Sequence, residues 1–185
     1  MNNNDRLVRL RYALDIKDND MVEIFKLGGM DLTKEDIKKM LDKKTKESPS
    51  EVKEEEFKNN EYKKECSNQT LESFLNGLIT FKRGKKESDA KDLEPKVVMT
   101  LTNTNVNNLL LKKIKIALSL TSEDMLGVLG NAGVEISKSE LSAVLRKEGH
   151  RNYKQCGDRY ARNFLKGLAI AWREWFFSLL ISLDS

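Results

Sequence analysis

Residues 64–83 read KECSNQTLESFLNGLITFKR, and residues 154–173 read KQCGDRYARNFLKGLAIAWR. The two stretches align without a gap at an offset of 90, and seven of their 20 positions are identical. Upstream, residues 5–43 align with 109–147 at an offset of 104, with nine identities in 39 positions. Self-similarity of this length predicts two copies of one structural unit in tandem.

The fall in offset from 104 to 90 means that the first copy carries 14 additional residues. They fall at about 47–62, which contains Pro49 and the run Glu54-Glu55-Glu56, so we predict a solvated acidic insertion. The predicted organisation is therefore repeat 1 over residues 1–83, a linker over 84–106 interrupted by Pro95, and repeat 2 over 107–185.

Each repeat contains four stretches with the apolar spacing of a helix. Leu7, Leu10 and Leu14 lie on one face of the first, and residues 111, 114 and 118 repeat this pattern. Capping residues precede the third stretch in both repeats, and Gly29 and Gly133 follow the second. We predict an all-α fold of two four-helix repeats, related by pseudo-two-fold symmetry and packed together.

The fourth stretch of each repeat has a glycine in its interior, Gly77 or Gly167. Glycine inside a helix costs about 1 kcal/mol relative to alanine. We therefore expect another helix to approach closely at both positions.

Few residues in the chain suit catalysis or metal binding. The sequence has two cysteines and one histidine, His150, too few for a disulfide scaffold or a zinc site of cysteine and histidine. No nucleophile has an evident base, and no secretion signal or run of 18 apolar residues is present. These features favour a cytoplasmic, non-enzymatic protein without a cofactor.

Cys66 and Cys156 each lie just before a fourth helix, two residues ahead of Asn68 or Asp158, which are candidate N-caps. A cysteine near a helix N-terminus can have a lowered pKa and act as a redox sensor. The structural alternative, which we favour, is a small buried residue at the joint between helices.

The chain resembles the bacterial YehS-like family. The resemblance rests on the cysteine followed eight residues later by Phe-Leu-x-Gly-Leu, on Lys82-Arg83-Gly84-Lys85 and Leu93-Glu94-Pro95, and on Asn107-Asn108 with Leu111-Lys112-Lys113. It implies an all-helical, tandemly duplicated protein of the bacterial cytoplasm and implies no activity. The chain departs from the family pattern in its long acidic insertion and in the apolar tail at 175–181.

Two surfaces are candidates for binding a partner. Trp172 begins an apolar series that continues at 175, 176, 179, 180 and 183. This series either packs on repeat 1 or forms an exposed patch for a protein partner, a second copy or a membrane surface. We rank that protein contact first. The alternative is RNA or DNA binding through helix-turn-helix-like second and third helices and a basic surface. The basic residues are Arg146, Lys147, Arg151, Lys154, Arg159 and Arg162, with Lys82, Arg83 and Lys85.

Overall fold

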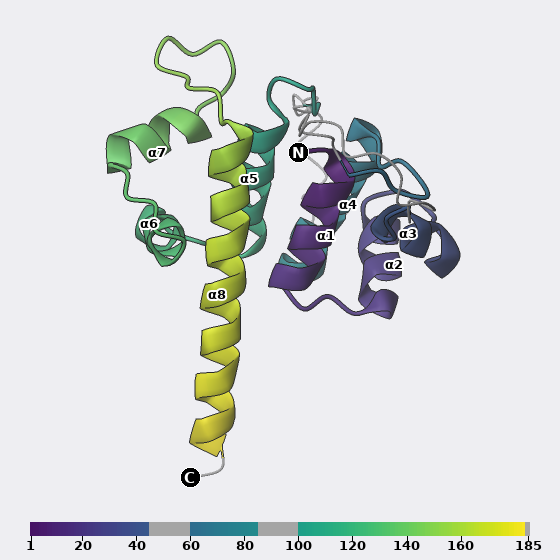
Figure 1. Ribbon diagram of the computed structural model, residues 1–185. Coiled ribbons are helices and arrows are strands. Elements are labelled where there is room, and N and C mark those ends of the chain that lie inside the picture. Colours follow the sequence, from purple (N-terminus) through teal and green to yellow (C-terminus); the bar gives the residue numbers. More distant parts are fainter. Residues whose placement is uncertain (45–59, 85–99, 184–185) are drawn as a thin grey trace, which may run out of the picture.

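The computed structural model describes residues 1–44, 60–84 and 100–183, with side chains through residue 173 at the carboxyl end. These residues are all-α and form two repeats of four helices, as predicted (Figure 1). The helices of repeat 1 are α1 (Asn3–Ala13), α2 (Asp18–Leu27), α3 (Lys34–Leu41) and α4 (Asn68–Arg83). Those of repeat 2 are α5 (Val106–Ala117), α6 (Ser122–Asn131), α7 (Lys138–Leu145) and α8 (Asp158–Leu183).

Local sequence signals set the ends of these helices. Ser137 and Glu140 form the predicted capping box of α7, and the Thr33 side chain accepts from the Asp36 backbone N–H at the start of α3. Gly29 and Gly133 have φ values of 84° and 76°, which only glycine adopts freely, and they end α2 and α6. One cap differs from the prediction: Ser67, not Asn68, caps α4, because its hydroxyl accepts from the Thr70 N–H.

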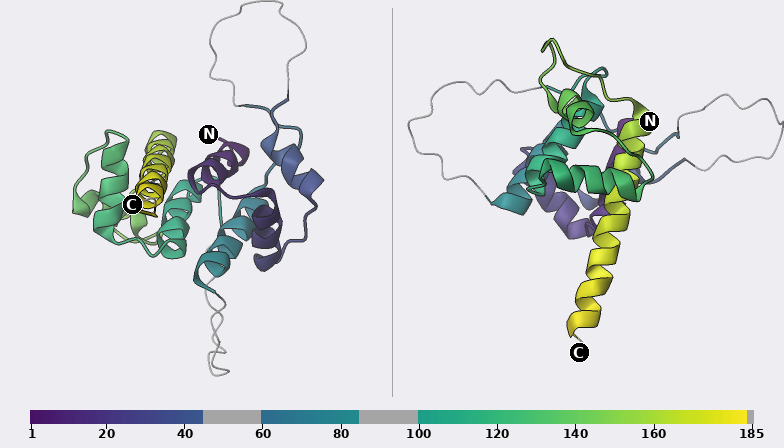
Figure 2. Two further views of the ribbon diagram at one scale, coloured as in Figure 1. Left: turned by 90° about the horizontal axis from the view of Figure 1, so that it is seen from below. Right: turned by 90° about the vertical axis from the view of Figure 1, so that its left-hand side faces the viewer.

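The first and fourth helices of both repeats form the centre of the molecule. The fourth helix of each repeat packs against the first helix of the other, so that α1 lies along α8 and α4 lies along α5. This reciprocal exchange is the pseudo-two-fold relation. The second and third helices cover the outside, α2 and α3 next to α4 and α1, and α6 and α7 next to α8 and α5 (Figures 1 and 2).

Both interior glycines mark a close helix contact, which confirms the prediction. A Cβ atom on Gly77 would lie 1.8 Å from the backbone oxygen of Ile24 in α2. A Cβ atom on Gly167 would lie 1.8 Å from the backbone oxygen of Val128 in α6. Since Ile24 and Val128 occupy equivalent positions in the two repeats, the same backbone contact fixes the fourth helix twice.

The two fourth helices differ in length: α4 has 16 residues and α8 has 26. The apolar series in the sequence was compatible with an end of α8 that packs on repeat 1. In the structure, the end of α8 instead runs beyond both repeats (Figures 1 and 2). Trp172 is half-buried and lines a groove with Leu120 and Val128. Within the residues described, no helix combines the length and the apolar character needed to cross a membrane.

Candidate functional site

A buried asparagine joins three segments in each repeat. The Asn4 amide donates to the carbonyl oxygens of Met40 and Lys64, each at 2.8 Å, and its Oδ1 accepts from the Cys66 N–H at 3.0 Å. Asn108 makes the same three bonds in repeat 2, with Val144, Lys154 and Cys156 at 2.8, 2.8 and 2.9 Å. Both asparagines are buried, so these bonds satisfy backbone groups that water cannot reach.

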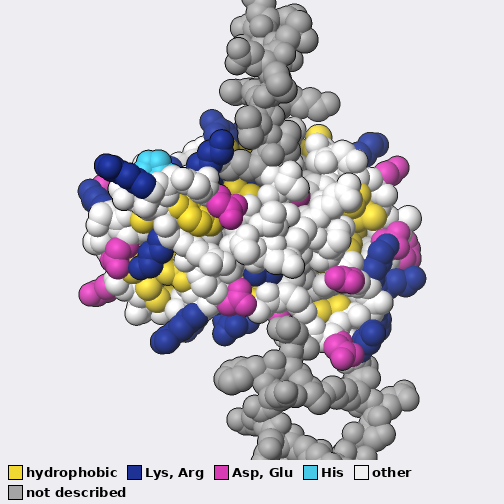
Figure 3. All heavy atoms as spheres, turned by 90° about the horizontal axis from the view of Figure 1, so that it is seen from above, with side chains coloured by type: hydrophobic (Ala, Val, Ile, Leu, Met, Phe, Trp, Pro, Cys, Tyr) yellow, Lys and Arg dark blue, Asp and Glu magenta, His cyan; other side chains and the backbone are white. Residues whose placement is uncertain are grey.

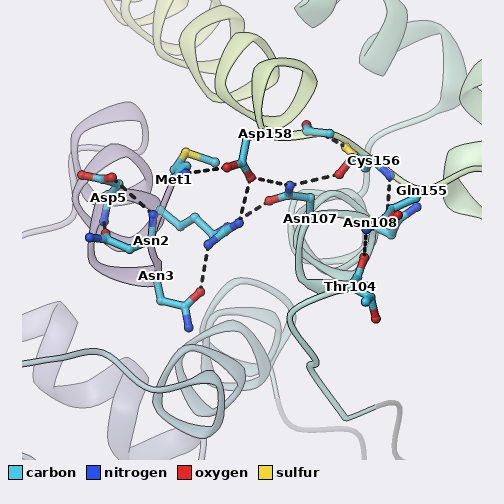
Figure 4. Close-up of polar contacts among 12 residues, drawn as sticks. Met1, Asn2, Asn3, Asp5, Thr104, Asn107, Asn108, Gln155, Cys156 and Asp158 are labelled. Carbon is cyan, nitrogen blue, oxygen red and sulfur yellow. Dashed lines mark hydrogen bonds and ion pairs between the residues drawn. The ribbon is translucent and has the colours of Figure 1, made fainter. Parts of the chain in front are cut away.

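A buried arginine then ties the two repeats together. Arg6 on α1 is 5% exposed, and its guanidinium donates to Asn107 on α5, to Asn3, and to Asp158 at the start of α8. Asn107 also donates to Asp158 and to the Cys156 carbonyl (Figure 4). The starts of α1, α5 and α8 therefore meet in one hydrogen-bonded cluster.

The ionisable side chains of the cluster, Arg6 and Asp158, stay charged. Burial lowers the pKa of Arg6, but the nearby Asp158 carboxylate opposes this change, and arginine stays protonated in proteins. Burial alone raises the pKa of Asp158. Hydrogen bonds from Asn107 and the Met1 amine, together with Arg6, outweigh it and hold the pKa of Asp158 below its usual range.

The cysteines have the properties of structural residues. Cys66 and Cys156 are 2% and 4% exposed and form no disulfide. Burial raises the pKa of each thiol to about 12, so almost none of it is thiolate at neutral pH. Their backbone N–H groups complete the asparagine contacts, which makes each cysteine part of the joint before its fourth helix.

The predicted basic residues fall into separate places. The segment between α7 and α8 carries Arg146, Lys147, Arg151 and Lys154, and the first turns of α8 carry Arg159 and Arg162. Lys82 and Arg83 end α4, whose start lies beside the start of α1 through an Asn3–Asn68 bond, so they lie at the opposite end of the helical centre. Lys85 lies outside the described residues.

The face at the starts of the central helices shows how charge is spread. Figure 3 views this face, where Lys and Arg side chains lie around the edge with Asp and Glu among them. The centre is mostly backbone and uncharged polar side chains. No group of three or more His, Cys, Asp or Glu side chains in the described ranges could hold a metal ion. His150 is an exposed loop residue whose Nδ1 accepts from the Asn152 N–H.

The two contacts between repeats differ most in charge. At the α4·α5 contact, the side chains of Glu72 and Lys113 are 12% and 13% exposed and lie 3.7 Å apart. Lys113 also donates to Asn76, and Glu72 accepts from the Leu101 N–H. Burial lowers the pKa of Lys113, and Glu72 opposes that change. A cation between helices is thus neutralised by an acid from the other repeat.

The equivalent positions at the α1·α8 contact are all basic. By the offsets of 104 and 90, Lys113 corresponds to Arg9, Glu72 to Arg162, and Asn76 to Lys166. All three basic residues are exposed, and none forms an ion pair within the part of the chain that the structure describes. Sequence reasoning placed Arg162 and Lys166 in the basic stretch at 146–166 but missed Arg9, although the aligned repeats already contain the substitution of Glu72 by arginine.

Comparison with known proteins places this architecture in one family. Residues 3–84 and 107–173 match the family described as a protein of unknown function (DUF1456). The uncharacterized protein YehS of Escherichia coli (strain K12) is 40% identical over 169 residues, which cover 91% of this chain and 95% of that protein. No solved structure matches. The resemblance seen in the sequence is confirmed, and the chain belongs to the DUF1456 family, whose two matched segments coincide with the two helical repeats.

Proposed function

We propose that this protein is a non-enzymatic binding protein that associates with a second copy of itself through the end of α8. The observation that carries the proposal is the length of α8. This helix is ten residues longer than its counterpart α4, and its end extends beyond both repeats (Figure 1). Gly84, with φ 78°, follows α4 at the point where α8 continues.

The sequence of this extension supports a helix contact. Residues 175, 176, 179, 180 and 183 are tryptophan, phenylalanine and leucines with the spacing of one helix face. An apolar helix that leaves its own domain lowers its free energy by burying that face. Two such helices from two copies of the chain can bury each other, as the helices of a coiled coil do.

A second copy suits the extension better than a membrane surface. Helices that lie on membranes carry Lys and Arg on a polar face, whereas residues 175–183 contain no charged residue. A span of the bilayer needs about 20 residues, so the extension is also too short to cross one. The family match ends at residue 173, which makes this association a property of the chain rather than of the whole family.

Light scattering over a range of protein concentrations tests the proposal. We expect the full chain to be dimeric, and the double variant Leu179→Glu, Leu180→Glu and a chain without residues 174–185 to be monomeric. Ser178→Glu is the control, because it adds a charge to the same segment outside the apolar series. Equal mass for the full chain and the double variant contradicts the proposal, as does a monomeric full chain that sediments with lipid vesicles.

A further inference from the structure

A groove runs along the α1·α8 contact, with a volume of about 360 Å³. Val8, Leu165 and Ala169 provide apolar surface in this groove, which is therefore formed by one helix from each repeat. We call it the α1·α8 groove. The groove residues on α8 precede residues 174–183, which carry the proposed self-association.

Basic side chains dominate the rim of the α1·α8 groove. Arg9 and Lys43 line it from repeat 1, and Lys166 lines it from repeat 2. Arg162 lies one helical turn before Lys166, on the same side of α8. Among the described lining residues, Asp5 is the one acid, and its Oδ1 accepts hydrogen bonds from Tyr62 at 2.8 Å and from Asn60 at 2.9 Å.

The corresponding contact between α4 and α5 shows that this charge is not required for packing. That contact achieves the same helix arrangement with Glu72 opposite Lys113. In the α1·α8 groove the acid is replaced by Arg162, which leaves the cations to repel one another unless an anion lies between them. The exposed cations of this contact therefore remain available to an anionic ligand.

An exposed aromatic ring completes the groove. Tyr12 is 57% exposed and lines the groove, and the Arg173 guanidinium lies over its ring, 3.9 Å from the ring centroid. The counterpart of Tyr12 in repeat 2 is Ile116, and the counterpart of Arg173 is Arg83, which donates to the Ile116 carbonyl instead. At these two equivalent positions, the α1·α8 side therefore has an aromatic ring with a stacked arginine, and the α4·α5 side has an isoleucine.

The spacing of the cations along α8 suits a row of phosphates. Arg162, Lys166 and Arg173 follow one side of α8, and a helix rises about 1.5 Å per residue, so they span about 16 Å. Proteins that bind single strands combine a basic groove along the backbone with aromatic side chains on which bases stack. A peptide made of acidic residues alone would use the cations but not the ring.

We infer that the α1·α8 groove binds single-stranded nucleic acid, with the phosphates along Arg9, Arg162 and Lys166 and a base on Tyr12. This inference is independent of the proposed self-association. It also differs from recognition by the second and third helices, because Arg9, Tyr12, Arg162 and Lys166 lie on the first and fourth helices of opposite repeats.

Fluorescence anisotropy of labelled 12-nucleotide poly-U and poly-dT with the full chain tests the inference. Five groove cations imply a slope of log affinity against log salt of about −3.5, hence a loss of about 100-fold between 50 and 200 mM salt. The double variant Arg9→Gln, Lys166→Gln should bind at least tenfold more weakly and flatten the slope by about 1.4. Tyr12→Ala should weaken binding without changing the slope, and Tyr12→Phe should restore it.

The matched control is Lys34→Gln, Lys38→Gln, which removes the same charge from exposed positions on α3. It should bind within about twofold of the unchanged protein, and all variants should keep their helical circular dichroism. The inference fails if the oligonucleotides do not bind at 50 mM salt or if the control loses as much affinity as the groove variant. It also fails if duplex DNA or a poly-glutamate peptide binds the groove as tightly as the single strands.

Discussion

The two repeats differ least where backbone meets backbone and most where side chains reach the surface. Asn4 and Asn108 make the same three hydrogen bonds, and Gly77 and Gly167 make the same helix contact. The side chains at the two contacts between repeats differ in charge: Glu72 lies at the α4·α5 contact, and Arg162 occupies the equivalent position at the α1·α8 contact. Duplication has preserved the backbone framework and let the charges diverge, which separates residues that hold the fold from residues free to acquire a ligand.

Loss of the buried asparagine should have the largest effect, and an equal one in both repeats. Asn4→Ala or Asn108→Ala leaves two carbonyl groups and one N–H buried without a partner, at about 1–3 kcal/mol each. We expect urea unfolding to show a loss of about 3–5 kcal/mol for either variant. Asn19→Ala, at an exposed position of α2, should change stability by less than about 0.5 kcal/mol. Clearly unequal losses at 4 and 108 would show that the frameworks are not equivalent.

Filling the interior glycines should come next. Gly77→Ala and Gly167→Ala force a methyl group into a backbone oxygen, so we expect each to lower the free energy of unfolding by about 3 kcal/mol. Gly127→Ala is the control, since nothing lies within 4 Å of a Cβ atom there. In the middle of α6 this change should raise stability by up to about 1 kcal/mol. In thermal unfolding, the midpoint temperature should fall for Gly77→Ala and Gly167→Ala and rise for Gly127→Ala. This difference distinguishes glycines at a helix contact from a glycine that is only part of a helix.

Removing the acid of the α4·α5 contact should have a moderate effect on one side only. Glu72→Gln keeps an acceptor for the Leu101 N–H but leaves Lys113 with Asn76 alone. Breaking a partly buried pair in this way should cost about 1–2 kcal/mol. At the equivalent position, Arg162→Gln should leave stability unchanged, because Arg162 has no acidic partner among the described residues. Similar losses of stability for both variants would contradict the idea that only the α4·α5 contact depends on an ion pair.

The smallest expected effect is a gain in stability. Arg162→Glu places a carboxylate opposite Arg9, as Glu72 stands opposite Lys113, and should stabilise the protein by about 0.5 kcal/mol at low salt. The gain should disappear when Arg9→Gln is added and should shrink in 1 M salt. The same Arg162→Glu change should weaken oligonucleotide binding. Stability and binding then move in opposite directions, which loss of folding cannot produce.

The framework was largely predictable because it depends on local patterns. Each repeat shows the same local signals in its sequence. They are the apolar spacing of helices, the capping residues such as Ser137, and the glycines at 29, 77, 133 and 167. Asn108 was recognised only within the family motif, and its match with Asn4 was missed because Asn4 lies just before Asp5, where the gapless alignment began. In repeat 1 it also belongs to the run Asn2-Asn3-Asn4, which has the composition of an exposed end.

The groove could not be predicted, because it depends on which helices of the two repeats lie together. Arg9 and Lys166 are 157 residues apart and carry no shared motif. Only the reciprocal packing of α1 with α8 brings them to one surface. The predicted basic surface combined residues by their neighbourhood in sequence, and the structure puts Lys82 and Arg83 at the far end from Arg146 and Arg151.

Arg6 has a consequence for which repeats can pair with each other. Its counterpart in repeat 2 is Leu110, and the counterpart of its carboxylate partner Asp158 is Asn68. Two copies of repeat 1 paired about a true two-fold axis would bury two arginines and supply no carboxylate for either, at a cost of several kcal/mol. Arg6 therefore suits the pairing of repeat 1 with repeat 2, which supplies Asp158, and disfavours the pairing of two copies of repeat 1.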